Sequence, residues 1–382
     1  METSTVSAQS VAAATGAGLK PTPHIRLVEP RVPRPAELLR GVVEILGSGQ
    51  LTNASQVTRF EAAAAEYLEV EHCVALSSCT AGLMLLGRCL DLSGEVILPS
   101  LTFFASGHAL LWNNLEPVFA DCDSDTLQIS AGSAGQGLTS RTSAILGVHL
   151  YGCPAPIDDL ERLADTAGVP LIFDGAHAWG ARWKGRSVAS YGAATVYSLS
   201  PTKQLTAGEG GIVATGDRHL AEALRKARNY GKGTSYDCDI LGLNARMTEL
   251  QGLMARLGLY GLDREISRRR ALAAVYEEEL GGVAGVRLQH TPAQAWNSHK
   301  DFPLIVRPED RPRIEAALET EGVETRRYFD PPLHRQKLYR RFFAEPLPHT
   351  EAVSDGVICI PLHGGMRRID AQRVARIIRD AC

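Results

Sequence analysis

From about Glu71 onward, short apolar runs alternate with stretches of helical periodicity, and this alternation limits what the chain can fold into more than any other feature. Strands that alternate with helices predict an α/β domain with a largely parallel sheet. The segment 156–168 is typical of an amphipathic crossover helix, and Gly168 is expected to end it. Strands are predicted at residues 73–78, 95–100, 117–122, 143–150, 170–174, 194–200 and 210–216, and helices at 80–90 and 104–112.

After about Arg218 the chain changes character, because long charged helices replace the alternation. They are predicted at 218–231 and 247–282, and the second is long enough to bridge two domains. Shorter elements beyond it indicate a smaller α+β domain, with strands at 286–290, 301–306 and 323–329 and helices at 311–319 and 369–380. We therefore expect an N-terminal tail at residues 1–25, a large domain at 26–255 and a small C-terminal domain at 256–382.

The charge balance argues against nucleic acid and membrane partners. The 382 residues carry a formal net charge of −3, so the chain has no overall basic field to hold a polyanion or an anionic bilayer. No apolar run approaches the roughly 18 residues of a membrane span, and the N-terminus lacks a secretory core, so we expect a cytoplasmic protein. The eight cysteines are scattered without zinc spacing, and neither GxxxxGK(S/T) nor HExxH occurs, so no metal site is expected.

A single lysine stands in the segment YSLSPTKQLTAGEGG, which runs from Tyr197 to Gly211. Of the 40 basic residues, seven are lysine and 33 are arginine, so arginine is the ordinary cation of this chain. A guanidinium stays protonated and cannot act as an amine nucleophile, whereas a lysine can. The choice of residue favours a chemical role for Lys203; the alternative is a lysine on a solvated turn.

Two further features fall at the carboxyl ends of predicted strands, where α/β proteins bind ligands. Residues 77–82, SSCTAG, pass from strand to helix, and the amides at such a helix start suit a phosphate, although a plain N-cap has the same sequence. Asp174 ends an apolar strand, and His177 follows it. The carboxylate can bind a metal, act as a base or pair with a cationic ring nitrogen, and either residue can instead be a helix cap or a satisfied core group.

A phosphate cradle, a carboxylate at a strand end and a loop lysine together fit one cofactor. Pyridoxal phosphate (PLP) is held by a lysine Schiff base, and an acidic residue pairs with its pyridinium nitrogen. That carboxylate keeps the nitrogen protonated, so the ring accepts electrons from a substrate carbanion. The three features therefore predict PLP as the cofactor, with Lys203 and Asp174 as catalytic residues.

Eight segments also occur in the order and spacing of a known family. From roughly Arg26 to its C-terminus, the chain resembles the DegT/DnrJ/EryC1/StrS sugar aminotransferases. The resemblance implies a fold-type I subunit, similar to aspartate aminotransferase, with a mostly parallel seven-stranded sheet and a smaller α+β C-terminal domain, and a homodimer with shared active sites. The segments are LTNASQVTRFE (51–61), SSCTAGL (77–83), PSLTF (99–103), VHLYG (148–152), FDGAHAWGA (173–181), SPTKQLTAGEGG (200–211), GLNARMTELQ (242–251) and YFDPPLH (328–334).

The resemblance also implies roles for individual residues. Lys203 matches the Schiff-base lysine and Asp174 the partner of the pyridinium nitrogen. Phe103 matches the aromatic residue that stacks on the ring, and His177 stands where a Gln or His contacts the cofactor. The remaining matches are phosphate ligands, namely Thr80, Ala81 and Ser198 and, acting in the neighbouring subunit's site, Asn244, and substrate contacts, namely Asn53, Tyr328 and His334. For the last two, a structural proline-rich turn is the alternative.

Three departures from the family pattern concern the substrate side of the site. Ser200 replaces a His that many members have three residues before the lysine, Trp179 stands where His or Leu is common, and Ala54 and Ser55 replace Gly-Pro. The roles of Ser200 and Trp179 do not follow from the sequence. The glycines after Lys203 are expected to leave room for the cofactor and the sugar to approach the backbone.

The resemblance implies a ping-pong transamination from glutamate to a nucleotide-linked ketosugar, in which Lys203 is anchor, base and acid. Segments such as SSCTAGLMLL and PVFADCDSDT look most similar to actinobacterial enzymes that aminate C4 of dTDP-4-keto-6-deoxy-D-glucose in deoxyaminosugar biosynthesis. Amination of a C3 ketosugar or of a keto-cyclitol is the alternative. A sugar dehydratase of the family is disfavoured, because those members have His in place of Lys203, and a PLP-binding protein without turnover is a third hypothesis.

Overall fold

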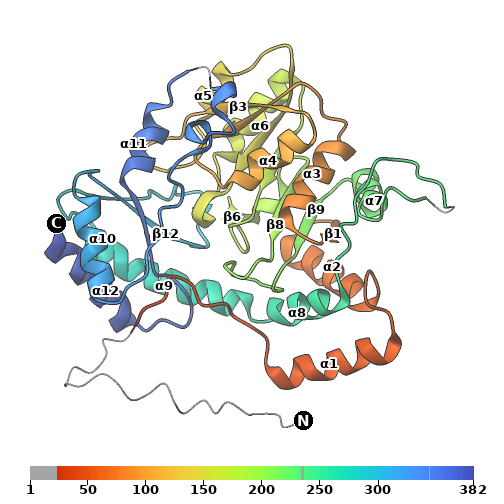
Figure 1. Cartoon of the computed structure of the whole chain (residues 1–382), viewed down its shortest axis with the longest axis horizontal. Coiled ribbons are helices and arrows are strands. Elements are labelled where there is room, and N and C mark those ends of the chain that lie inside the picture. Colours follow the sequence, from red (N-terminus) through yellow and green to blue (C-terminus); the bar gives the residue numbers. More distant parts are fainter. Residues whose placement is uncertain (1–23, 234–235, 344) are drawn as a thin grey trace, which may run out of the picture.

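A seven-stranded sheet forms the centre of the protein. The computed structural model describes residues 24–233, 236–343 and 345–382. The strand order is β1-β9-β8-β5-β4-β2-β3, and helices surround the sheet (Figure 1). The five strands from β8 to β3 run parallel, whereas β9 is antiparallel to both of its neighbours, so the mostly parallel sheet expected from the sequence is confirmed. The strands are β1 (His72–Leu76), β2 (Glu95–Pro99), β3 (Glu116–Ala120), β4 (Thr142–Val148), β5 (Leu171–Asp174), β8 (Ala194–Ser198) and β9 (Gly211–Thr215).

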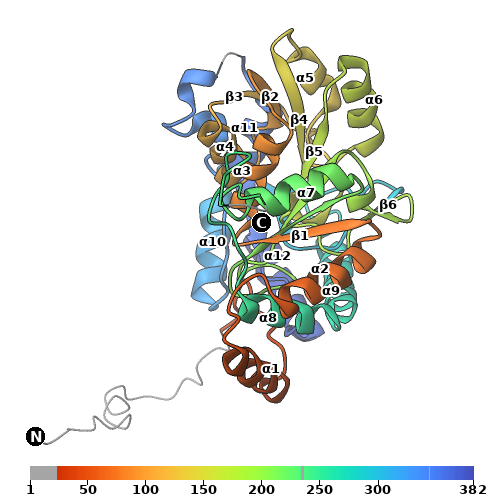
Figure 2. The same ribbon diagram turned by 90° about the vertical axis from the view of Figure 1, so that its right-hand side faces the viewer.

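Helices cover both faces of this sheet. Figure 2 shows α3 and α4 on one side of the strands and α5 and α6 on the other. Because the strands are buried on both faces, they carry continuous apolar runs, as expected of a parallel sheet. The covering helices are α2 (Ser55–Leu68), α3 (Cys79–Cys89), α4 (Phe104–Trp112), α5 (Ala131–Gln136), α6 (Ile157–Ala167) and α7 (Arg218–Ala227).

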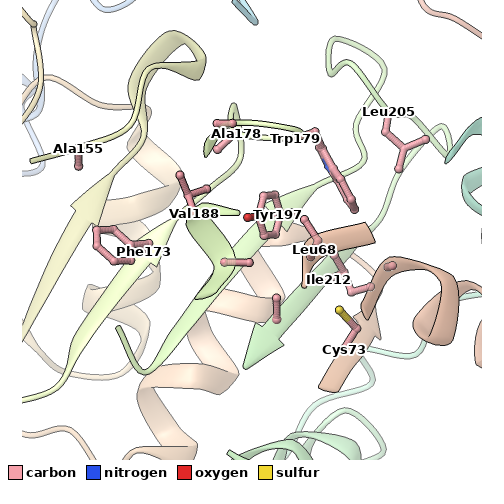
Figure 3. Packing of buried hydrophobic residues seen from close by; sticks show 14 of the residues in the cluster. Leu68, Cys73, Ala155, Phe173, Ala178, Trp179, Val188, Tyr197, Leu205 and Ile212 are labelled. Atoms are coloured by element: carbon pink, nitrogen blue, oxygen red, sulfur yellow. The ribbon is translucent and has the colours of Figure 1, made fainter. Parts of the chain in front are cut away.

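The two faces of the sheet have separate cores. Successive side chains of a strand point to opposite faces, so Phe173 belongs to one core and Ile172 to the other. Figure 3 shows the first of these cores, where Trp179 and Tyr197 lie beside one another with ring centres 4.9 Å apart. Phe173 and Tyr197 of this core directly precede Asp174 and Ser198, the last residues of β5 and β8.

Local signals place the helix ends. Gly168 follows α6 in the left-handed conformation, with φ 66°, as the sequence predicts. The Asp217 carboxylate accepts hydrogen bonds from two backbone amides at the start of α7. Thr248 and Gln251 form a capping box at the start of α8.

The single helix predicted at 247–282 is wrong, because the chain breaks into α8 (Glu249–Leu259) and α9 (Leu262–Leu280). The guanidinium of Arg31 donates a hydrogen bond to the carbonyl of Gly258 at 3.2 Å, and it fills the space in which a Cβ of Gly261 would stand. Arg31, distant in the sequence, thus provides a hydrogen-bond donor for a carbonyl in the last turn of α8. The glycines in this turn also favour a helix end, because glycine has a low helix propensity.

A three-stranded antiparallel sheet, in the order β10-β12-β13, packs against helices near the C-terminus. The strand predicted at 323–329 is wrong: Val323 and Arg326 each form one isolated bridge with a different segment, so no ladder develops. Instead, Tyr328 and Phe329 line a cavity. The elements here are α9, β10 (Val286–Leu288), β12 (Phe302–Val306), α10 (Arg311–Thr320), α11 (Pro348–Gly356), β13 (Val357–Ile360) and α12 (Arg368–Ala381).

The remaining elements lie at the periphery. α1 (Pro35–Ser48) packs on α8 at the edge of the molecule (Figures 1 and 2). A small sheet joins β6 (Arg182–Trp183), β7 (Arg186–Ser187) and β11 (Ala295–Trp296). Within the described ranges, no helix is long and apolar enough to cross a membrane. The predicted tail at residues 1–25 lies almost entirely outside the described residues.

Candidate active site

A cavity of about 440 Å³, here called the inner cavity, opens at the carboxyl ends of β4, β5 and β8. Asp174 ends β5, Ser198 ends β8, and both line it. Lys203 and the first turn of α3 complete the wall. The structure therefore brings together the three features that the sequence placed at strand ends.

Asp174 is a buried carboxylate held by two hydrogen bonds. Its Oδ2 accepts from the hydroxyl of Ser106 at 2.7 Å, and its Oδ1 accepts from the backbone amide of Ala176 at 3.0 Å. Burial raises the pKa of this carboxyl, while the two hydrogen bonds and the charge of Lys203 oppose the increase. No cationic side chain of the described residues forms an ion pair with it, so the site can accept a cationic group of a ligand.

Lys203 is half-buried in the turn that follows β8, and its backbone amide donates to the carbonyl of Ser200 at 3.1 Å. Burial, followed by the charge of Lys300, lowers the pKa of Lys203 to about 8. At pH 7, about a tenth of such amines are unprotonated, far more than for a lysine in water. The lysine is therefore suited to act as a nucleophile and a base.

The start of α3 forms the third side of the inner cavity. Ser78 is its N-cap, and the Ser78 hydroxyl accepts a hydrogen bond from the amide of Ala81 at 3.1 Å, which occupies that amide. Thr80 and Ser198 both line the cavity. The helix start and the two hydroxyls can hold a phosphate.

Gly211 has a different reason for being glycine than the one expected. A Cβ there would stand 2.6 Å from the carbonyl oxygen of Ser78, so the space serves the packing of β9 against the start of α3 rather than the cofactor or the sugar. The glycine thus affects the candidate phosphate cradle only indirectly, through the backbone at the start of α3.

His177 is buried and neutral. Its Nδ1 accepts a hydrogen bond from the backbone amide of Tyr151 at 3.2 Å, so the ring proton is on Nε2. Burial, together with the charges of Lys203 and Lys300, lowers the pKa of His177 well below its usual value. The residue can therefore offer a neutral N–H donor to a ligand in the inner cavity, which it lines.

Other predicted contacts differ in their placement. Phe103 and Tyr328 line the inner cavity, whereas Asn53, Asn244 and His334 do not. Asn244 is exposed, and Asn53 sits in the left-handed region with φ 48°. His334 is buried, and its Nδ1 lies 2.6 Å from the hydroxyl of Ser100, which supports the structural interpretation of that turn.

The two departures left open by the sequence are now placed. Ser200 lines the inner cavity, and its amide donates to the hydroxyl of Ser198 at 3.3 Å. Trp179 is fully buried in the core of Figure 3, where its indole N–H donates to the Ser198 carbonyl at 3.0 Å. Both residues thus hold the end of β8.

Sequence reasoning missed Lys300, Asp301 and Ser106. Lys300 lines the inner cavity, and its ammonium pairs with Asp301 at 2.8 Å. Its signal was present, because Lys300 is another of only seven lysines in a chain that prefers arginine.

Among the described residues, no group of three or more His, Cys, Asp or Glu side chains could hold a metal ion.

The chain is similar in sequence and in fold to known aminotransferases. Residues 35–379 match the model of the DegT/DnrJ/EryC1/StrS aminotransferase family. The chain is 35% identical over 352 residues to dTDP-3-amino-3,4,6-trideoxy-alpha-D-glucose transaminase of Streptomyces venezuelae, with 90% of this chain and 92% of that protein covered. It is 26% identical over 364 residues to dTDP-4-amino-4,6-dideoxy-D-glucose transaminase of Escherichia coli, with coverage of 93% and 98%. A crystal structure of DesI in the presence of its TDP-sugar product superposes with a TM-score of 0.88 at 36% identity, covering 93% of this chain and 92% of that one.

Proposed function

Because this chain belongs to the DegT/DnrJ/EryC1/StrS aminotransferase family, we propose that it transfers an amino group from glutamate to a nucleotide-linked ketosugar, with PLP as cofactor. The expected fold, that of a type I aminotransferase, is confirmed by the family match and the structural likeness. The observation that carries the proposal is the meeting of Lys203 and Asp174 in one cavity beside the start of α3.

The side chains of the inner cavity fit PLP. Asp174 is a buried carboxylate without an ion-pair partner among the described residues, and a protonated ring nitrogen would supply one. Thr80 and Ser198 would hold the phosphate, and the exposed ring of Phe103 would stack on the pyridine. The bound cofactor supplies an electron sink beside the amino-bearing carbon.

The residues of this chain then provide binding and proton transfer. Lys203 Nζ would hold the cofactor and would carry the α-proton of the amino donor, a role that its lowered pKa favours. Asp174 would keep the ring nitrogen protonated through a charge-assisted hydrogen bond. His177, which lines the inner cavity, would offer its neutral N–H to the cofactor.

A second cavity of about 820 Å³, here called the outer cavity, supports a nucleotide-linked substrate. It shares Phe103, Tyr328 and Phe329 with the inner cavity. Lys337 and Arg340 line it, both are exposed, and neither side chain has a hydrogen-bond or ion-pair partner among the described residues. Two free cations beside aromatic rings suit a diphosphate and its base.

For the substrate, we propose dTDP-4-keto-6-deoxy-D-glucose, aminated at C4 in deoxyaminosugar biosynthesis. The support is the likeness of the segments around α3 and β3 to enzymes of that kind. The alternative is amination at C3, since the Streptomyces venezuelae relative is named for a 3-amino sugar and the Escherichia coli relative for a 4-amino sugar.

Incubation with glutamate and either 3- or 4-ketosugar nucleotides tests both claims. Formation of 2-oxoglutarate supports transamination, and NMR of the product locates the new C–N bond. A product aminated only at C3 contradicts the choice of C4. No 2-oxoglutarate with any ketosugar would favour a PLP-binding protein without turnover.

We also propose that the protein is a homodimer with shared active sites. Leu39, Val43 and Leu46 expose 64%, 70% and 62% of their surface along α1, which an apolar interface would cover. Asn244 is exposed and outside the inner cavity of its own chain, as expected of a residue that reaches the phosphate of the other subunit.

A further inference from the structure

Lys300 is a buried cation in the wall of the inner cavity. Lys300 exposes only 2% of its surface, and its ammonium donates a hydrogen bond to Asp301 Oδ1 at 2.8 Å. The same nitrogen lies 5.6 Å from the ring centre of Tyr328. An ammonium has three N–H donors, and a single acceptor is found for it among the described residues, so two donors are left for a ligand.

The backbone holds Lys300 in place. Its amide donates to the carbonyl of Tyr151 at 2.8 Å, and its carbonyl accepts from the guanidinium of Arg269 at 3.1 Å. Asp301 then holds the ammonium itself. The Lys300 side chain is therefore held in place before a ligand binds, so binding does not have to order it.

The inner cavity offers few other cations. No arginine of the described residues lines it, although arginine supplies 33 of the 40 basic residues of the chain. Lys203 is committed to the cofactor, and His177 is neutral. Lys300 is therefore the fixed positive charge that this part of the site presents to an anionic substrate.

We propose that Lys300 binds the carboxylate of the amino donor. This inference rests on the proposed function, because an amino acid that gives its amine to PLP brings a carboxylate into the same buried space. A carboxylate there needs a partner, and the N–H groups of Lys300 provide one. Since Asp301 balances much of the lysine's charge, the pair suits a single carboxylate group.

The other anion of the reaction, a diphosphate, fits elsewhere. It carries more charge, and the outer cavity offers it Lys337 and Arg340, which are exposed and have no partner among the described side chains. Lys300 is thus assigned to the donor and the outer cations to the nucleotide.

Calorimetric titration of glutarate into the PLP-loaded protein tests the assignment, because glutarate carries the donor's carboxylates and has no amine to react. We expect Lys300→Met to weaken glutarate binding about 10- to 100-fold and Lys300→Arg to retain part of the affinity. Because the first change leaves Asp301 unpaired in the interior, the double variant Lys300→Met/Asp301→Asn is measured as well. Lys226→Met, which removes an exposed lysine paired with Asp239, is the matched control and should bind as the wild type does.

Thymidine diphosphate is titrated in parallel, and its affinity should be the same in every variant. Wild-type glutarate affinity in the folded double variant overturns the proposal, as does a wild-type protein that binds no glutarate. Loss of thymidine diphosphate affinity with retained glutarate affinity assigns Lys300 to the nucleotide and overturns it too. The proposed function fails separately: if glutarate binding depends on Lys300 but the wild type releases no 2-oxoglutarate, the carboxylate site stands and the transamination does not.

Discussion

Gly211→Ala tests how the phosphate cradle is built. The new Cβ would stand 2.6 Å from the carbonyl oxygen of Ser78, and even nearer to Ser78 C and Cys79 N, against ordinary contacts of 3.4 Å or more. All three atoms belong to backbone, so no side chain can rotate away. The start of α3 must therefore move, or β9 must.

Overpacking of this kind costs typically about 1–3 kcal/mol. We therefore expect Gly211→Ala to lower the free energy of unfolding, measured by urea denaturation, by about 1–3 kcal/mol. The shift of α3 should also weaken PLP binding, measured by fluorescence titration, because the helix start would hold the phosphate.

Gly216→Ala is the matched control. Gly216 follows the other end of β9, and a Cβ there meets no atom within 4 Å. Its stability should be unchanged or raised by about 0.4–1 kcal/mol through loss of freedom in the unfolded chain. If Gly211→Ala matches this control in both stability and PLP affinity, the close approach of β9 to α3 does not position the cradle.

Two substitutions and one chemical modification further probe the site and the dimer. Ser106→Ala removes the hydroxyl that donates to Asp174 at 2.7 Å. The affinity for PLP, measured by fluorescence titration, should fall about 3- to 10-fold. An unchanged affinity would show that this hydrogen bond does not position the Asp174 carboxylate for the cofactor. In cofactor-free protein, the modification of Lys203 by trinitrobenzenesulfonate, followed by mass spectrometry, should rise with pH to a midpoint near 8 and level off well above it, because only the neutral amine reacts. A midpoint near 10.5 would contradict the lowering of the Lys203 pKa by burial and by the charge of Lys300. Val43→Asp charges the exposed face of α1 and should convert a dimer into monomers in analytical ultracentrifugation, whereas an intact dimer would locate the interface elsewhere.

The sheet and most helices followed from the sequence because their signals are local. A glycine that ends α6 and an apolar run that ends at Asp174 act within a few residues. The break between α8 and α9 did not follow, since it depends on Arg31, which lies 227 positions from the carbonyl it binds.

The candidate site divides in the same way. Lys203 and Asp174 were found because each is unusual in its own segment. Ser106 and Lys300 became visible only when the fold placed them beside Asp174 and in the inner cavity. The scarcity of lysine marks Lys300 as well, but all seven lysines share that signal, so only the fold singles it out.

We propose that Lys203 is the residue that holds PLP. Borohydride reduction of the PLP-loaded protein fixes the pyridoxyl group to its lysine, and peptide mass spectrometry identifies that lysine among the seven of the chain. We expect the label on Lys203 and none in Lys203→Arg. A label on Lys300 or on any other lysine would contradict it.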